Sequence, residues 1–169
     1  MGGETDQLEY YLSSLDELGE VLINADRARS VGGGILRLTL GTVMASKGAI
    51  FLYNNQDNQI SFLSTRGVEP HDPFKPTKAF LAKLEKYRHG HALLSGKEKW
   101  ITGRFKKYVV QSKTKVVLPL YHKKNLLGVL CIGEKFMKEE YSSIDIKILE
   151  IISNHLTKAL YNYQLINSV

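Results

Sequence analysis

The most constraining feature of this sequence is a pair of apolar runs separated by a short polar turn. Residues 114–121 and 126–133 flank the segment His122-Lys-Lys-Asn125, a pattern that predicts two antiparallel strands joined as a hairpin. The second run is apolar without alternation, as expected of a strand buried on both faces. Pro119 lacks an N–H and so favours a bulge or an edge position in the first strand. A fold for this chain must therefore cover both sides of a sheet.

The middle of the chain predicts a second hairpin and further helices. Its strand-like segments are short, apolar and aromatic, and a polar turn joins them. The expected elements are strands at 48–54 and 60–65, a helix at 77–88, a short strand near Trp100 within the loop 90–103, and one or two helical turns at 104–111.

Helices are also expected at both ends. From Leu8 onward, apolar residues step by three and four, which forms a seam on one helix face. Gly32-Gly33-Gly34 is expected to interrupt this helix, and an amphipathic helix follows at 35–46. The last helix should begin at Ser142 or Ser143 and carries a similar seam from 149 to 166. The seams predict helix-to-helix contacts.

Length and composition point to one domain of an α/β (α+β) class. A chain of 169 residues is about one domain long. We expect residues 1–34 to form an N-terminal helix with a glycine-rich break and residues 35–169 to form the body of the same domain. Strands in hairpins, with helices between and at both ends, favour an antiparallel sheet covered by helices.

Charge and cysteine content limit the binding partners and the cellular compartment that we expect for this chain. The net charge is +6, with the excess mainly between Lys75 and Lys124, but no nucleic-acid-binding motif accompanies it, so a solvated surface is favoured over nucleic-acid binding. Cys131 is the only cysteine, which suits a reducing compartment. The N-terminus has no signal-peptide pattern, and no run of 18 apolar residues could cross a membrane. We expect a cytoplasmic protein without membrane association.

Taken in order, these segments resemble a GAF domain. The resemblance rests on Val116-Val-Leu-Pro-Leu-Tyr, then Leu126-Leu-Gly-Val-Leu-Cys-Ile-Gly-Glu-Lys135, then Tyr141-Ser-Ser-Ile-Asp145, and then the long helix at 149–163. It implies a sheet of about six strands with the terminal helices packed on one face. It also implies a small-molecule site on the other face, and terminal helices that form a homodimer and pass a signal to an output domain.

The resemblance assigns residues to these two roles. Phe51 and Tyr53 share the strand face expected to look into the ligand site, which further aromatic residues and an arginine would close. These residues fill the core in the alternative interpretation. The expected ligand-binding residues are Phe51, Tyr53, Trp100, Arg104, Phe105 and Tyr108. The expected dimer-interface residues are Leu8, Leu15, Leu22, Leu149, Ile152, Leu156 and Tyr163.

Catalytic and metal-binding patterns are not found. Gly90 and Gly96 enclose five residues where a phosphate-binding loop needs four, and Glu98 stands where that loop needs Ser or Thr. His89 and His91 have no cysteine or carboxylate cluster beside them. We therefore predict a non-catalytic sensory or regulatory domain with no metal site, and the sequence indicates no particular cofactor. The alternatives are an effector-binding domain of a transcription regulator and, less favoured, a redox enzyme that uses Cys131.

Overall fold

A single antiparallel sheet organises the computed structural model, which describes residues 25–167. Its strand order is β2-β1-β5-β4-β3. The elements are α2 (Ala25–Val43), β1 (Gly48–Asn54), β2 (Gln59–Arg66), α3 (Lys78–Lys86), β3 (Ala92–Leu93), α4 (Gly103–Ser112), β4 (Thr114–His122), β5 (Asn125–Gly133) and α5 (Ser143–Asn167). The expected class, an antiparallel sheet covered by helices, is confirmed.

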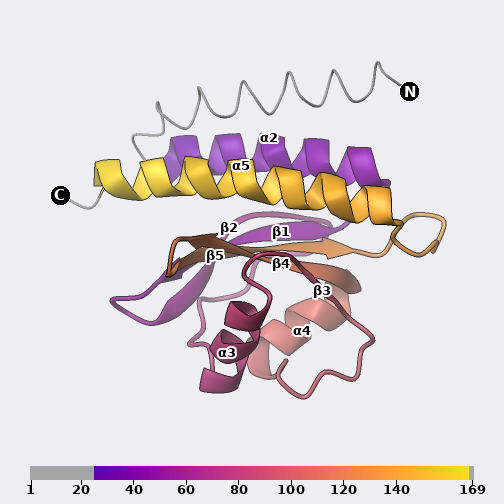
Figure 1. Ribbon diagram of the computed structural model, residues 1–169, viewed down its shortest axis with the longest axis horizontal. Coiled ribbons are helices and arrows are strands. Elements are labelled where there is room, and N and C mark those ends of the chain that lie inside the picture. Colours follow the sequence, from indigo (N-terminus) through magenta and orange to yellow (C-terminus); the bar gives the residue numbers. More distant parts are fainter. Residues whose placement is uncertain (1–24, 168–169) are drawn as a thin grey trace.

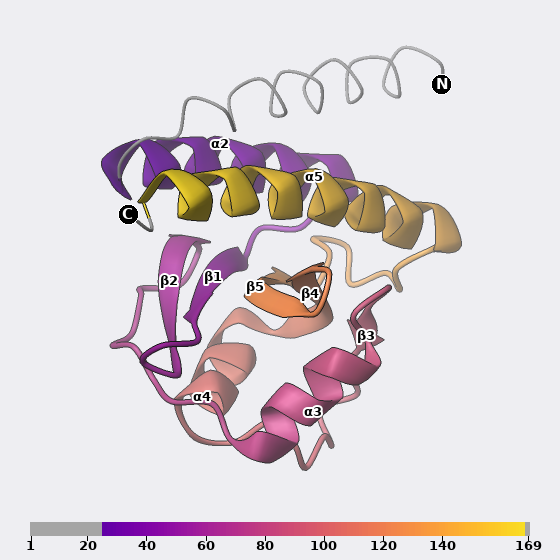
Figure 2. The same ribbon diagram turned by 60° about the vertical axis from the view of Figure 1, so that its left-hand side comes forward.

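Helices cover both faces of this sheet. Helices α2 and α5 lie side by side and antiparallel on one face, while α3 and α4 lie on the other (Figures 1 and 2). The described sheet has five strands where about six were expected. Trp100 lies in a turn, and the short strand β3 instead forms at Ala92–Leu93, where it pairs with Val116 and Val117 of β4.

The expected helix break at the three glycines is wrong. Helix α2 runs through Gly32, Gly33 and Gly34 without interruption. Each glycine costs a helix about 1 kcal/mol relative to alanine, but packing outweighs this cost. Gly32 is buried, and a Cβ built there would lie 3.2 Å from Cδ2 of Leu63 on β2. The glycine therefore lets α2 approach the sheet closely.

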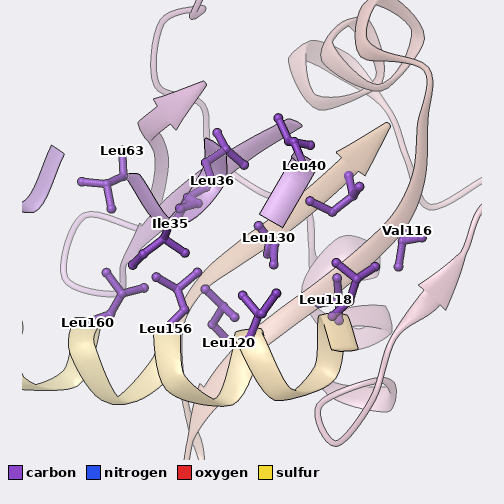
Figure 3. Close-up of a cluster of buried hydrophobic side chains, with 14 of the residues drawn as sticks. Ile35, Leu36, Leu40, Leu63, Val116, Leu118, Leu120, Leu130, Leu156 and Leu160 are labelled. Atoms are coloured by element: carbon purple, nitrogen blue, oxygen red, sulfur yellow. The ribbon is translucent and has the colours of Figure 1, made fainter. Parts of the chain in front are cut away.

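The face beneath α2 and α5 contains the larger apolar core (Figure 3). Leucines from both helices meet leucines and isoleucines of β4 and β5 there, including Leu36, Leu118 and Leu130. Leu149, Ile152 and Leu156, expected at a dimer interface, are 0%, 1% and 1% exposed within this core. Burial of such a side chain stabilises the fold by about 1.5–3 kcal/mol. These three residues hold α5 on its own sheet and offer no surface to a second chain.

The hairpin between β4 and β5 has the expected bounds to within a residue or two. His122 pairs with Asn125, so the turn consists of Lys123 and Lys124, and Lys123 has a left-handed backbone with φ of 56°. Gly128 in β5 is required by a close approach, because a Cβ there would collide with the carbonyl oxygen of Phe51. Pro119 lies beyond the two residues of β4 that β3 pairs with, so the expected edge position is confirmed.

The start of α5 is fixed by several polar contacts. The Asp145 N–H donates to Oγ of Ser142 at 3.1 Å, and the Ser142 N–H donates to Oδ2 of Asp145 at 2.9 Å, an arrangement that caps a helix N-terminus. Lys135 Nζ lies 2.6 Å from the same carboxylate oxygen. The Tyr141 hydroxyl donates to the Gly133 carbonyl at 2.6 Å. Helix α5 is thereby tied to the end of β5.

Candidate functional site

The sheet face beneath α3 and α4 is filled by aromatic rings. Ring centroids in this group are 4.5 to 6.5 Å apart, and several pairs meet edge to face, the geometry that aromatic pairs prefer. The group comprises Phe51, Phe62, Phe74, Phe80, Phe105 and Tyr108. Three expected ligand-binding residues, Phe51, Phe105 and Tyr108, are 0–1% exposed. A ligand could lie between them only if the rings separated.

Two protic groups are sealed beside these rings. Burial raises the pKa of the Cys131 thiol far above its usual range. Burial also raises the pKa of Tyr108, whose hydroxyl has no hydrogen-bond partner within the described chain. The nearby hydroxyls of Ser112 and Thr114 instead bond to each other at 2.5 Å. Both groups stay protonated at neutral pH, and a buried thiol that stays protonated is a poor nucleophile.

An open cleft of about 440 Å³ lies at the edge of this region, between α3 and the ends of three strands. Thr77 is the N-cap of helix α3, and its hydroxyl oxygen accepts a hydrogen bond from the Phe80 N–H. One stripe of the helix, with Phe80 and Leu84, faces the core, and a neighbouring stripe faces the cleft. The cleft is lined by Tyr53, Asn55, Lys78, Leu81, Ala82, Glu85, Tyr121, Lys124, Asn125 and Leu126.

The strand side of the cleft consists of two tyrosines and a leucine. Tyr53, Leu126 and Tyr121 come from the neighbouring strands β1, β5 and β4. The Tyr53 hydroxyl donates to Oδ1 of Asn58 at 2.9 Å, which fixes its ring. Burial raises the pKa of Tyr121 to about 12, and the Glu85 carboxylate adds to the rise. The Tyr121 phenol is therefore neutral at physiological pH and able to donate a hydrogen bond.

A smaller cavity of about 90 Å³ lies near the start of α4 and would hold roughly three water molecules. Trp100, Arg104 and Phe105 line it. The Arg104 guanidinium is already engaged, because its Nη1 donates to the Pro73 carbonyl at 2.9 Å and lies 4.0 Å from an Asp72 carboxylate oxygen. This space is too small for a ligand of more than a few atoms.

The expected ligand-binding residues thus divide among three places. Tyr53 lines the open cleft, three residues line or border the small cavity, and Phe51 and Tyr108 belong to the aromatic core. Sequence reasoning missed Tyr121, Leu126 and Glu85. A usable signal was present: Tyr121 ends a strand at the hairpin, and Leu81 and Glu85 are spaced four apart on one helix face.

The hairpin beside the cleft also reaches the opposite face of the sheet. His122 follows Tyr121, and successive strand residues point to opposite faces. The His122 ring stacks on Tyr161 of α5 with centroids 3.7 Å apart and 20° between planes. Helix α5 has a second polar contact on this side, with the residue that precedes β3: His91 Nδ1 lies 3.7 Å from Glu150 Oε2. Glu150 and Tyr161 are eleven residues apart, so they share one side of the helix.

Residues 25–167 offer neither a metal-binding cluster nor a membrane-spanning helix. This part of the chain holds no group of three His, Cys, Asp or Glu side chains able to hold a metal ion. Its helices include none with the length and apolar character that a membrane crossing needs.

Comparison with protein-family models finds no match, and comparison with curated proteins finds none either. Solved structures do match. The GAF domain of a phosphoenolpyruvate-protein phosphotransferase from Acinetobacter aligns with a TM-score of 0.70 at 10% identity, over 98% of this chain and 96% of that one. The GAF domain of a two-component sensor histidine kinase from Bacillus halodurans gives 0.58 at 19% identity, over 78% and 95%.

An enzyme shares this architecture as well. The free methionine-R-sulfoxide reductase of Neisseria meningitidis, solved in complex with its substrate, aligns with a TM-score of 0.61 at 10% identity, over 91% of this chain and 88% of that one. These likenesses show that the chain has the GAF fold, as the sequence resemblance implied.

Proposed function

We propose that this GAF-fold chain is a non-catalytic sensory or regulatory module that binds a small molecule in the cleft beside α3. The bound molecule changes the position of α5, which passes the signal to an output domain or to a second copy. The names of similar structures support a sensory role, since they include a sensor histidine kinase and a cyanobacterial phytochrome. The buried Cys131 fits the reducing interior of a cell, where we place the protein.

The observation that carries this proposal is the hairpin with a different contact on each face. Tyr121 lines the cleft, and His122, the next residue, stacks on Tyr161 of α5. A ligand that displaces the hairpin must therefore also change the support of α5. Such a ligand shifts the helix only by its difference in affinity for two hairpin positions, and couplings of this kind amount to about 1–3 kcal/mol.

A homodimer through the terminal helices is part of the proposal. Because Leu149, Ile152 and Leu156 are core residues, a contact through α5 would use its outward face, where Ile144 is 70% and Ile151 39% exposed. Tyr163, on the last turns of α5, is half-buried. The remaining expected interface residues, Leu8, Leu15 and Leu22, lie outside the described residues.

The structure is compatible with one alternative function and disfavours another. The effector-binding domain of a transcription regulator would use the same cleft and helix, so only an attached DNA-binding domain distinguishes it. The redox-enzyme alternative needs a reactive Cys131, whose side chain is 0% exposed and whose pKa burial raises. Cys131→Ser tests it: loss of a thiol-dependent activity that the wild type possesses would favour the enzyme.

Filling the cleft by mutation tests the signalling proposal without a known ligand. Ala82 is exposed on the cleft side of α3, so Ala82→Trp places a large ring in the cleft and leaves the core intact. We expect hydrogen exchange at residues 158–164 of α5 to change at least about threefold. Ala82→Ser is the matched control and should leave this exchange as it is.

The route through the hairpin has its own control. In an Ala82→Trp, His122→Ala double variant the effect on α5 should disappear relative to His122→Ala alone, because the stack that connects hairpin and helix is gone. An effect of the same size in the double variant would refute the route. Unchanged exchange in Ala82→Trp itself would refute the coupling of cleft and helix.

A further inference from the structure

We propose that the cleft beside α3 takes a small anionic compound with a flat aromatic ring. This inference rests on the proposed function, since it names the class of ligand for the same cleft. The charge, the ring surfaces and the hydrogen-bond donors that line the cleft support it.

The part of the chain that contains α3 is strongly basic. Residues 67–113, which contain the layer of α3 and α4 and the edge strand β3, include nine lysines and two arginines against four acidic residues. This segment has a net charge of +7, so the rest of the chain amounts to −1. A cleft in such a layer lies in a positive potential, which raises the local concentration of anions.

The charged side chains that line the cleft are also mainly basic. Lys78 comes from the first turn of α3 and Lys124 from the hairpin turn opposite, so each wall of the cleft carries a lysine. Glu85 is the single carboxylate among the lining residues. Both lysines are exposed and without an ion-pair partner in the described chain. They are free to bind a carboxylate, sulfonate or phosphate group.

The cleft also presents ring surfaces. Tyr53 and Tyr121 stand on either side of Leu126, on three neighbouring strands, and Leu81 of α3 lies across from them. All four side chains are partly exposed, so they offer apolar surface that a ligand would cover. Aromatic side chains favour offset or edge contacts with other rings. An aromatic compound should therefore bind this lining more tightly than an aliphatic compound of the same charge.

The cleft presents hydrogen-bond donors as well. The Tyr121 hydroxyl makes no hydrogen bond within the described chain and, as a neutral phenol, can donate one. The amides of Asn55 and Asn125 add N–H donors at the rim. Two ammonium groups, a phenol and two amides supply more donors than the Glu85 carboxylate can accept. An anionic group on the ligand matches this surplus.

A matched pair of fluorescent probes tests the inference. 1-Anilinonaphthalene-8-sulfonate is an anion with a flat naphthalene ring, and N-phenyl-1-naphthylamine has the same rings without the sulfonate. Both brighten on leaving water, so titration of the intact chain gives a dissociation constant for each. We expect the sulfonate to bind at least about tenfold more tightly, and its advantage to shrink as salt increases. Equal affinity for the two probes would overturn the inference.

Charge variants then locate the site. Lys78→Gln with Lys124→Gln should weaken sulfonate binding about tenfold, as expected for two charge-assisted contacts, and leave the neutral probe within twofold. Glu85→Gln should strengthen sulfonate binding. The matched control is Lys147→Gln with Lys158→Gln, an equal charge change at exposed positions of α5, and should have less than a twofold effect. A control effect as large as that of the cleft pair would overturn the assignment.

Other binding places give a different pattern. Phe136 and Met137 are 60% and 75% exposed and could attract either probe through apolar contact. Binding there would be indifferent to Lys78 and Lys124, which would also overturn the proposal. Since probe binding is measured without reference to α5, it can succeed when the coupling to α5 fails. A tight sulfonate site with an unresponsive α5 would refute the signalling role and leave the ligand class standing.

Discussion

Leu156→Ala distinguishes a core role for the α5 seam from a role between two chains. Leu156 is 1% exposed and lies in the cluster between α5 and the sheet. Leucine-to-alanine changes at such sites cost about 3 kcal/mol, the sum of lost apolar transfer and a residual cavity. With a urea dependence of about 2 kcal/mol per molar, the unfolding midpoint should fall by about 1.5 M.

Urea unfolding followed by far-ultraviolet circular dichroism measures this change. The experiment is run at about 1 µM and about 100 µM protein, since an interface residue would act through association, and a hundredfold rise in concentration would then restore about 2.7 kcal/mol. For a core residue the loss is the same at both concentrations. Val110→Ala, at a 66% exposed position of α4 away from the terminal helices, is the control and should cost under about 1 kcal/mol.

Two results would refute this reasoning. A loss below about 1 kcal/mol for Leu156→Ala would show that the side chain is not packed as a core residue. A loss of stability that disappears at the higher protein concentration would show that Leu156 lies at an interface between two chains.

Three further predictions concern other parts of the chain. Gly128→Ala should lower the free energy of unfolding by about 3 kcal/mol, because the new Cβ would collide with the backbone of β1. Gly41→Ala has open space around it and should raise the free energy of unfolding by up to about 1 kcal/mol. Chemical denaturation measures both changes. Burial tends to raise the pKa of Asp145, but its lysine and serine contacts lower it, so their stabilisation is present above the unfolded-state pKa and is lost as the pH falls. The advantage of wild type over Asp145→Asn in the free energy of unfolding should therefore shrink between about pH 7 and about pH 3, and an unchanged difference would contradict the Lys135–Asp145 pair. A double-mutant cycle of His122→Ala and Tyr161→Leu should give a coupling of about 0.5–1.5 kcal/mol, and strict additivity would mean that the stack contributes nothing.

Local signals were enough for most elements of the fold. The β4–β5 hairpin follows from two apolar runs and a polar turn, and β1 has the expected bounds of 48–54. The start of α5 follows from a serine with an aspartate three residues later, whose side chain and N–H complete the cap. In each case the residues that determine the local structure are near neighbours in the chain, so the sequence alone is enough to predict it.

The candidate site could be predicted only in part, because its residues come from separate elements. The alternation of strand residues predicted that Phe51 and Tyr53 share one face of the sheet, which they do. It could not show that rings from α4 would cover Phe51 while Tyr53 lines an open cleft. That difference depends on how far α3 and α4 extend over the sheet. The cleft and the His122–Tyr161 stack arise from the same tertiary placement.

The sequence by itself determined the hairpins, the two-sided burial of β5 and the amphipathic helices, because spacing and residue type decide these locally. Tertiary structure alone decided that α2 continues through three glycines, since the packing of this helix in the core outweighs their helix cost. It alone decided that the α5 seam belongs to the core. A stripe of leucines at helical spacing requires an apolar partner but does not specify which one, and here the sheet of the same chain supplies it.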